Sequence, residues 1–194
     1  MVLQTKTSVI FLLLACIAVI SCSEGKGLST VNVDAGALPF THAENVSDLI
    51  SDSGITRYRL QAKIWDIYSN DTVPYWHFPE GVLLDKYDTL FRVDGSVRAD
   101  TAYFYEKKDL WRLIGNVFAQ NTKEETFETE ELFWNNGESP ASTHAVYTDK
   151  PVKITKGEEI IYARGGLRSN RSMTHYVFYS SGAEVTVNEN EEQP

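Results

Sequence analysis

Thiols are nearly absent from this 194-residue chain, because its two cysteines, Cys16 and Cys22, both lie near the amino terminus. The remainder cannot form a disulfide scaffold, a thiolate metal site or a cysteine nucleophile. The sequence also lacks HExxH, GxGxxG, GxxxxGK[ST], GxSxG and EF-hand patterns, so zinc-protease, nucleotide-binding, hydrolase and calcium-loop interpretations have no support. We therefore predict no catalytic residues, no metal and no cofactor.

Positive charge is also scarce, since 18 Lys and Arg residues stand against 27 Asp and Glu residues, for a formal net charge of −9. Binding to nucleic acid requires clustered cations that displace counterions from phosphates. Attraction of a polybasic segment to an anionic membrane has the same requirement. We predict that the protein binds no nucleic acid.

Long apolar runs are missing except near the amino terminus, where residues 9–20 form an uncharged stretch of 12 residues. A membrane-spanning helix needs about 20 such residues, whereas a signal-peptide core needs roughly 7 to 15. The stretch ends in Val19-Ile20-Ser21-Cys22, which resembles the lipobox of bacterial lipoproteins. The resemblance implies cleavage before Cys22 and diacylglyceryl modification of its thiol. The alternative is an incidental cysteine beside an ordinary cleavage site.

From residue 54 onward, short stretches rich in β-branched and aromatic residues alternate with turn-forming residues. This pattern is typical of an antiparallel sandwich, jelly roll or barrel, and no long amphipathic helix is indicated. The clearest period-two alternation places Trp111, Leu113, Gly115, Val117 and Ala119 on one face. A second alternation places Val97, Ala99, Thr101, Tyr103 and Tyr105 together. Further strands are expected at 56–66, 77–87, 125–134, 143–147, 152–154, 159–164 and 174–179.

The predicted organisation has four parts: a signal peptide at 1–21, a lipidated cysteine and flexible tether at 22–52, a β domain at 53–187 and an acidic tail at 188–194. The tether is inferred from small and polar residues without helical or alternating periodicity.

Aromatic residues are abundant and leave two other functions open. The tryptophans Trp65, Trp76, Trp111 and Trp134 could form the sugar-stacking platform of a carbohydrate-binding lipoprotein, or they could simply fill a core. A glycosidase needs only two carboxylates at about 5 to 9.5 Å, and acidic residues are plentiful. Charged residues at exposed strand positions are the more common explanation.

Five segments follow one another in a fixed order: DTAY at 100–103, WRLIGNV at 111–117, FETEELFW at 127–134, YTDKPVKI at 147–154 and IIYARGGL at 160–167. Together they resemble the repeat shared by periplasmic lipopolysaccharide-transport proteins of the OstA/LptA type. With SGITRY at 53–58, YWHFPEG at 75–81 and EKK at 106–108, the chain resembles the LptC family in its Bacteroidetes-type form. The resemblance covers residues 52–179, approximately.

The resemblance implies an open antiparallel β-jellyroll, a twisted trough of two sheets, without enzymatic activity. Such a protein takes lipopolysaccharide, held by its lipid A portion, from an inner-membrane ABC transporter complex. It passes the lipid to a periplasmic bridge protein of the LptA type. Better-known members keep an uncleaved transmembrane helix, whereas Cys22 here predicts a lipid anchor. We expect a periplasmic, membrane-anchored protein, with the inner membrane favoured.

Inward faces of the two sheets would form the acyl-chain lining if the sheets are incompletely packed. The alternative is that the same residues fill a sandwich core. The candidate lining residues are Tyr58, Leu60, Ala99, Tyr103, Leu113, Val117, Phe127, Ile161 and Ala163.

Basic residues could meet the phosphates of the ligand at the rim of the trough, although ordinary surface charge is the favoured explanation for them. They are Arg57, Arg59, Lys107, Lys108 and Arg112. Partner proteins would pair with exposed edge strands. We predict these edges near 56–62 and 174–179, with Thr56, Tyr58, Thr174 and Tyr176 at the contacts.

Overall fold

The computed structural model describes residues 38–52, 54–69, 73–180 and 183–187. The predicted signal peptide, Cys22 and the acidic tail lie outside these residues. Within them the only helical element is the 3-10 turn η1 (Glu106–Lys108), and no helix is long and apolar enough to cross a membrane. The strands are β1 (Thr41–Asp52), β2 (Ile55–Tyr68), β3 (Tyr75–Phe78), β4 (Val82–Tyr87), β5 (Val93–Ala99), β6 (Thr101–Tyr105), β7 (Leu110–Gln120), β8 (Thr126–Asn135), β9 (Val146–Thr148), β10 (Val152–Lys156), β11 (Glu159–Ala163), β12 (Leu167–Ser169), β13 (Tyr176–Ser180) and β14 (Ala183–Val187).

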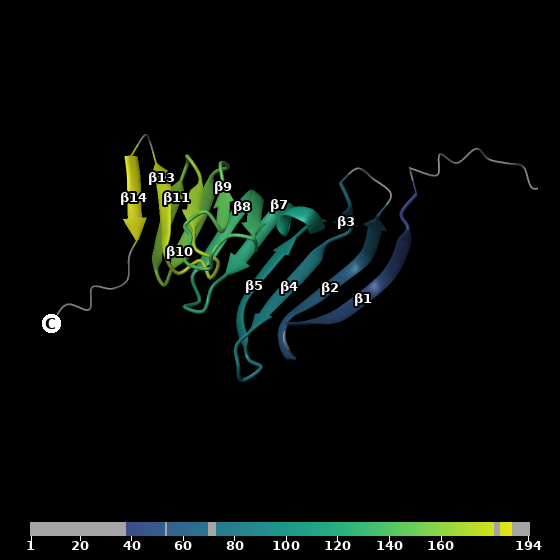
Figure 1. Ribbon diagram of the computed structural model, residues 1–194. Helices are drawn as coiled ribbons and strands as arrows, with labels where there is room; N and C mark the ends of the chain where they lie inside the picture. The colour runs from purple at the N-terminus through teal and green to yellow at the C-terminus, as the bar shows by residue number, and fades with distance from the viewer. Residues whose placement is uncertain (1–37, 53, 70–72, 181–182, 188–194) are drawn as a thin grey trace, which may run out of the picture. The chain divides into compact units, whose positions relative to one another are not determined.

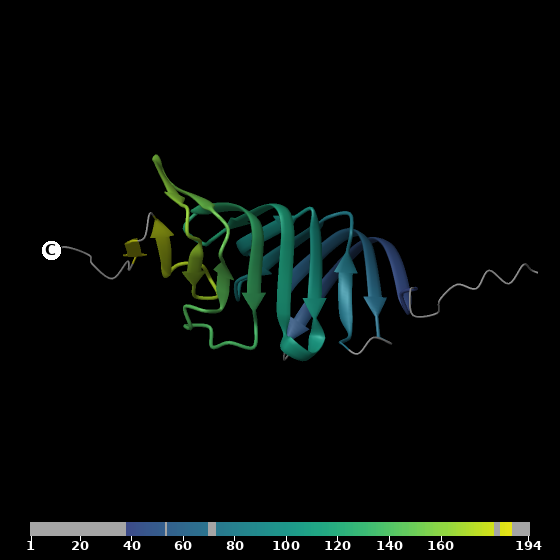
Figure 2. The same cartoon turned by 90° about the horizontal axis from the view of Figure 1, so that it is seen from above.

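The strands form an antiparallel meander that crosses the sheet in nearly the order of the chain (Figure 1). β4 pairs with the first part of β2 and β3 pairs with its last part, so β3 and β4 act as one bent strand. β5 and β6 pair in the same way with the two parts of β7, and β10 and β9 with the two parts of β8. Figure 2 shows the long strands curving over between two layers.

The first layer contains β4, β5, β10 and β11, and the second contains β3, β6, β9, β12 and β13, while β2, β7 and β8 contribute to both. This arrangement confirms the predicted all-β, jellyroll-like trough.

The bend between the two layers is fixed where β7 approaches Asp100 closely. A Cβ atom on Gly115, where φ is +78°, would lie 3.0 Å from a carboxylate oxygen of Asp100. The backbone N–H of Asp100 donates to the carbonyl of Gly115, and Asn116 Nδ2 donates to Asp100 Oδ2 at 2.6 Å. Gly115 and Asn116 together face a single residue of β8, which is a β-bulge. The bulge therefore turns β7 from one layer into the other.

Near the bend, inward-facing side chains fill the space between the layers. The predicted alternation in β7 is confirmed for Trp111, Leu113, Val117 and Ala119, each at most 6% exposed. Burial of these residues stabilises the bend, because the apolar area removed from water spans both layers.

The alternation predicted through residues 97–105 is wrong in its second half. Ala99 faces the core, but after the bend at Asp100 the buried residue is Ala102. The extra residue at the bend shifts the phase by one, and Tyr103 therefore points outward. There its ring stacks on that of His77, with centroids 4.5 Å apart.

The predicted tether is wrong for residues 41–52, which form β1 and pair with β2 along its length. The polar sequence of β1 gives no alternating apolar pattern, because the strand is held mainly by backbone pairing and packs only Val46 and Ile50 against the core. The β domain therefore begins before residue 53.

The predicted edges are also wrong. Thr56 and Tyr58 lie in β2, which β1 covers on its outer side. β13 lies between β12 and β14, Thr174 precedes it, and Tyr176 is only 1% exposed. Among the described strands, β1, β11 and β14 each pair with a neighbour on one side only.

Candidate functional site

An apolar cavity of about 170 Å³ lies between the two layers at the ends of the strands farthest from the bend, a region that we call the mouth. Both layers contribute to its wall. The lining residues are Ile50, Tyr58 and Leu84 from the first layer and Trp76, Phe104, Asp109, Trp111, Trp134 and Asn136 from the second.

Strand direction gathers the aromatic residues at this place. Trp76 lies near the start of β3, Phe104 near the end of β6, Trp111 near the start of β7 and Trp134 near the end of β8. Because neighbouring strands are antiparallel, these positions meet at one end of the second layer. The ring of Phe104 lies 4.9 Å from that of Trp76 and 4.8 Å from that of Trp111. Tyr58 of the first layer contacts Trp134 edge-on at 6.2 Å.

The indole of Trp134 is an exception in this wall. Its Nε1–H is buried and has no hydrogen-bond partner among the described residues, whereas Nε1 of Trp76 donates to Glu106 Oε1. A buried donor without an acceptor costs about 1–3 kcal/mol. An acceptor atom that enters the cavity would remove this cost.

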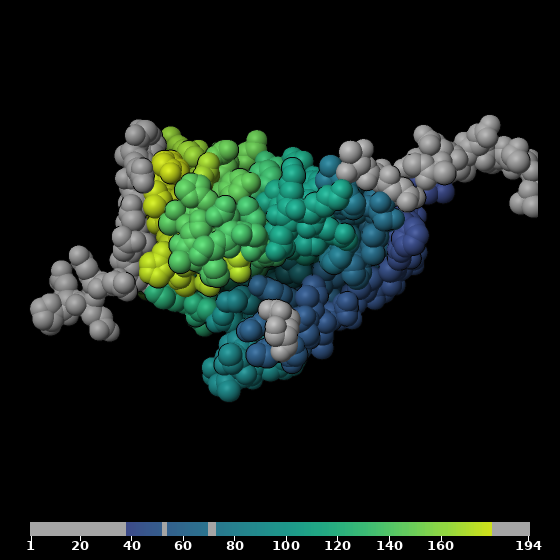
Figure 3. All heavy atoms as spheres, viewed as in Figure 1, coloured from purple at the N-terminus to yellow at the C-terminus, as the bar shows by residue number. Residues whose placement is uncertain are grey.

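A second hollow of about 480 Å³ continues from the cavity and shares four lining residues with it. In Figure 3 the surface is hollowed between the blue amino-terminal strands and the teal and green central strands. Arg57, Lys86 and Arg171 line it. Lys86 pairs with Asp94 at 2.7 Å, whereas Arg57 forms no ion pair with a described residue. The mouth therefore has an apolar interior and a cationic rim.

The other half of the mouth is closed by a buried polar cluster, which we call the clasp: Asn121, Glu125 and Met173. Asn121 Nδ2 donates to the carbonyl of Met173 at 2.9 Å and to Glu125 Oε2 at 2.7 Å. Asn121 and Glu125 are 5% and 2% exposed. Nearby, burial in the core raises the pKa of Tyr176 well above its usual range. The clasp joins the β7–β8 hairpin of the first layer to the loop between β12 and β13 of the second.

Of the nine predicted lining residues, only Tyr58 borders the cavity. Tyr103 faces outward, as described above, and Ile161 is partly buried against the core. The other six lie between the layers and are enclosed by the protein's own side chains. They are Leu60, Ala99, Leu113, Val117, Phe127 and Ala163, each at most 7% exposed.

Sequence reasoning did not select the other eight lining residues, which are the aromatic residues of the second layer together with Ile50, Leu84, Asp109 and Asn136. A usable signal existed for Trp76, which alternates with the buried Phe78 in a short strand. Trp111 and Trp134 were noted for a sugar platform and not for an internal cavity.

The predicted basic residues separate into three groups. Arg57 lies at the rim. Arg59 pairs with Asp85 at 2.7 Å and Arg112 with Glu131 at 2.8 Å, on the outer faces of the two layers. Lys107 and Lys108 are exposed in η1. Surface charge is thus the correct description for four of the five.

Comparison with known proteins shows to which family the chain belongs. No curated protein matches the chain. A family profile described as "Lipopolysaccharide-assembly, LptC-related" matches residues 8–174, which include all strands from β1 to β12. The match spans well over half of the sequence, and the chain therefore belongs to the LptC-related family of lipopolysaccharide-assembly proteins.

Proposed function

We propose that this protein binds lipopolysaccharide by its acyl chains at the mouth and relays it from an inner-membrane ABC transporter to a periplasmic bridge protein of the LptA type. Family membership supports a part in lipopolysaccharide transport. The observation that carries the proposal is an apolar cavity that continues into a cationic rim. This order of surfaces matches an amphiphile that has acyl tails next to phosphate groups.

The size of the cavity sets a condition for binding. An apolar cavity of about 150 Å³ accommodates one benzene-sized molecule, and the cavity here measures about 170 Å³. A complete fatty acyl chain is larger, so the layers must separate further at the mouth when the lipid enters. Each buried methylene contributes about 0.8 kcal/mol. Most of this contribution cancels, because the lipid leaves equivalent contacts in a membrane, and a small net preference suits a relay.

Polar groups at the mouth supply the remaining contacts. The guanidinium of Arg57 can bind a phosphate oxygen, because it has no acidic partner among the described residues. The unpaired Nε1–H of Trp134 is available for an acyl carbonyl oxygen. The ligand would therefore satisfy groups that the protein leaves unpaired.

Anchoring and hand-over complete the proposal. Diacylglyceryl modification of Cys22 would hold the protein on a membrane, with the inner membrane favoured, and mass spectrometry of the mature amino terminus tests it. The outer side of β1 presents backbone groups along a strand of 12 residues, to which a partner strand can add.

Photo-cross-linking tests the lipid-binding proposal with two neighbouring positions of β6. Benzoylphenylalanine at Phe104 would face the cavity, and at Tyr103 it would face outward. With lipopolysaccharide present, we expect a lipid adduct from position 104 and little from position 103. Equal adducts at both positions, or adducts at 103 alone, would refute binding at the mouth.

A further inference from the structure

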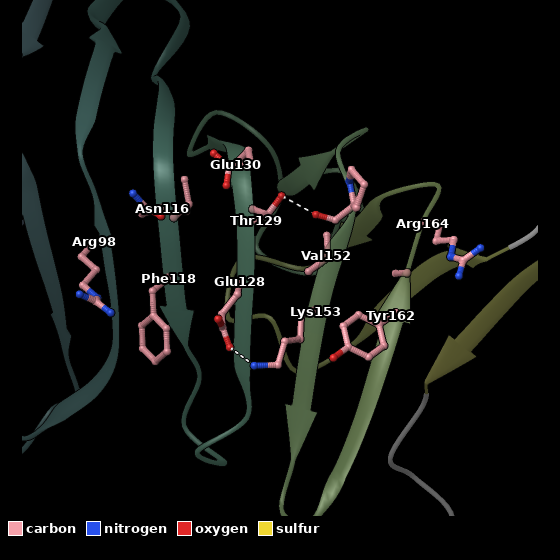
Figure 4. A pocket seen from close by; sticks show the side chains of 13 residues that line it. Arg98, Asn116, Phe118, Glu128, Thr129, Glu130, Val152, Lys153, Tyr162 and Arg164 are labelled. Carbon is pink, nitrogen blue, oxygen red and sulfur yellow. Dashed lines mark hydrogen bonds and ion pairs between the residues drawn. The ribbon is translucent and has the colours of Figure 1, made fainter.

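A groove of about 930 Å³, larger than the cavity between the layers, lies on the outer face of the first layer and is shown in Figure 4. We call it the outer groove and define it by Arg98, Phe118, Glu128, Lys153 and Tyr162. These residues are successive register partners on β5, β7, β8, β10 and β11. Four strand spacings of about 4.8 Å give the row a length of about 19 Å.

The floor of the outer groove is a solvent-exposed ion pair, in which Lys153 Nζ lies 2.8 Å from Glu128 Oε1. Aromatic rings stand on both sides of this pair (Figure 4). The guanidinium of Arg98 lies 4.9 Å above the ring of Phe118. On the other side, Tyr162 is 62% exposed, an unusual exposure for a large aromatic residue in a strand.

The charge of the outer groove differs from that of the whole chain. Its lining has three cations and two carboxylates, although the net charge of the protein is −9. Lys153 is neutralised by Glu128. Arg98 and Arg164, at opposite ends, form no ion pair with a described residue, while Glu130 is the remaining carboxylate. Two guanidinium groups, one on β5 and one just after β11, are thus available for anions.

We propose that the outer groove binds an oligosaccharide that carries phosphate or carboxylate groups. Aromatic rings offer flat apolar faces to the C–H faces of sugars, and the ion pair of Lys153 and Glu128 offers a donor and an acceptor to hydroxyl groups. Arginine forks match phosphate and carboxylate oxygens. Acyl chains do not fit, because they would bury the charged floor without compensation. The origin of this oligosaccharide rests on the proposed function. If that function holds, the ligand is the saccharide part of lipopolysaccharide.

The test uses the full-length protein and acyl-free, phosphorylated core oligosaccharide released from lipopolysaccharide. Nuclear magnetic resonance shifts are recorded with this probe, with the same oligosaccharide after dephosphorylation and with inorganic phosphate alone. We expect shifts at Phe118, Lys153 and Tyr162 with the phosphorylated probe. Tyr162→Ser and Arg98→Gln should each weaken binding about tenfold, the effect of one lost charge-assisted or aromatic contact.

Matched controls exclude a general loss of structure. Ile160→Ser changes an exposed residue on the same strand and face, outside the groove lining, and Lys107→Gln removes a cation from the other layer. Both should bind the probe as the unchanged protein does. Absence of shifts in the groove, or equal weakening by the controls, would overturn the proposal. Equal binding of the dephosphorylated probe would overturn its anionic part, and binding of phosphate alone with the same affinity would overturn the saccharide part.

Failure of this proposal and failure of lipid binding at the mouth are separable. The probe has no acyl chains, and the cross-linking at Phe104 uses intact lipid. An adduct at Phe104 without shifts in the groove would refute the saccharide site alone.

Discussion

The two halves of the mouth are built from the same meander but are closed in different ways. In the half near β1, aromatic rings face each other across a cavity of about 170 Å³. In the half near β13, the gap is only about 30 Å³ and the clasp bridges the layers with buried hydrogen bonds. Trp134 borders both spaces. The difference arises from the hairpin at residues 121–125, whose side chains reach the other layer.

The comparison indicates which half opens. Apolar contacts across a cavity depend mainly on burial, which is non-directional, and they can re-form on an acyl chain. Opening the clasp would expose Asn121, Glu125 and a backbone carbonyl without equivalent partners in a lipid. We infer that the clasp holds the layers together while the half near β1 separates.

The largest effect is expected from removal of the clasp by Asn121→Ala. This change eliminates two donated hydrogen bonds and leaves the buried Glu125 with fewer partners. The free energy of unfolding should fall by about 2–4 kcal/mol, measured by urea denaturation. Amide exchange should accelerate in residues 170–175. Thr122→Ala, at an exposed neighbouring position, should change little, and similar losses from both variants would contradict a specific clasp.

A smaller effect on stability and a large effect on binding are expected from Ile50→Asp. Ile50 lines the cavity, and its neighbour Leu49 is 50% exposed and outside the lining. A carboxylate in the wall should reduce lipopolysaccharide cross-linking at Phe104 about tenfold, because acyl burial would then desolvate a charge. The control Leu49→Asp should retain cross-linking. Retention by both variants would place the lipid elsewhere.

The smallest effect is expected from Trp134→Phe. The substitution removes a buried N–H that has no partner, so the free energy of unfolding should stay within about 1 kcal/mol of the unchanged protein. Trp76→Phe loses the hydrogen bond to Glu106 and should be the less stable of the two. The reverse order in urea denaturation would show that the indole of Trp134 is satisfied.

The sequence was sufficient for the all-β class and for the inward face of β7, because period-two alternation reports one-sided burial directly. The sequence pattern did not predict the features that depend on backbone geometry and strand pairing. The extra residue at the bend near Asp100 shifts the alternation by one position, so the side chain of Tyr103 points outward and not inward. The formation of β1 depends on pairing with β2 and not on its own polar composition.

The candidate site was less accessible to sequence reasoning. Tyr58 was identified, but Trp76 and Phe104 meet it only because antiparallel strands end at the same side. The clasp left no signal, since Asn121 and Met173 are 52 positions apart in the chain. Contacts between loops of different layers follow from the bend, which the local pattern does not encode.

Pulsed electron-electron double resonance with two spin-label pairs is the most direct test of the mouth. One pair, at Ser51 and Lys107, spans the half near β1, and the other, at Thr122 and Thr143, spans the half near the clasp. On addition of lipopolysaccharide, we expect the first distance to increase and the second to stay constant. An unchanged first distance, or an increase at the clasp alone, would contradict lipid entry between the layers near β1.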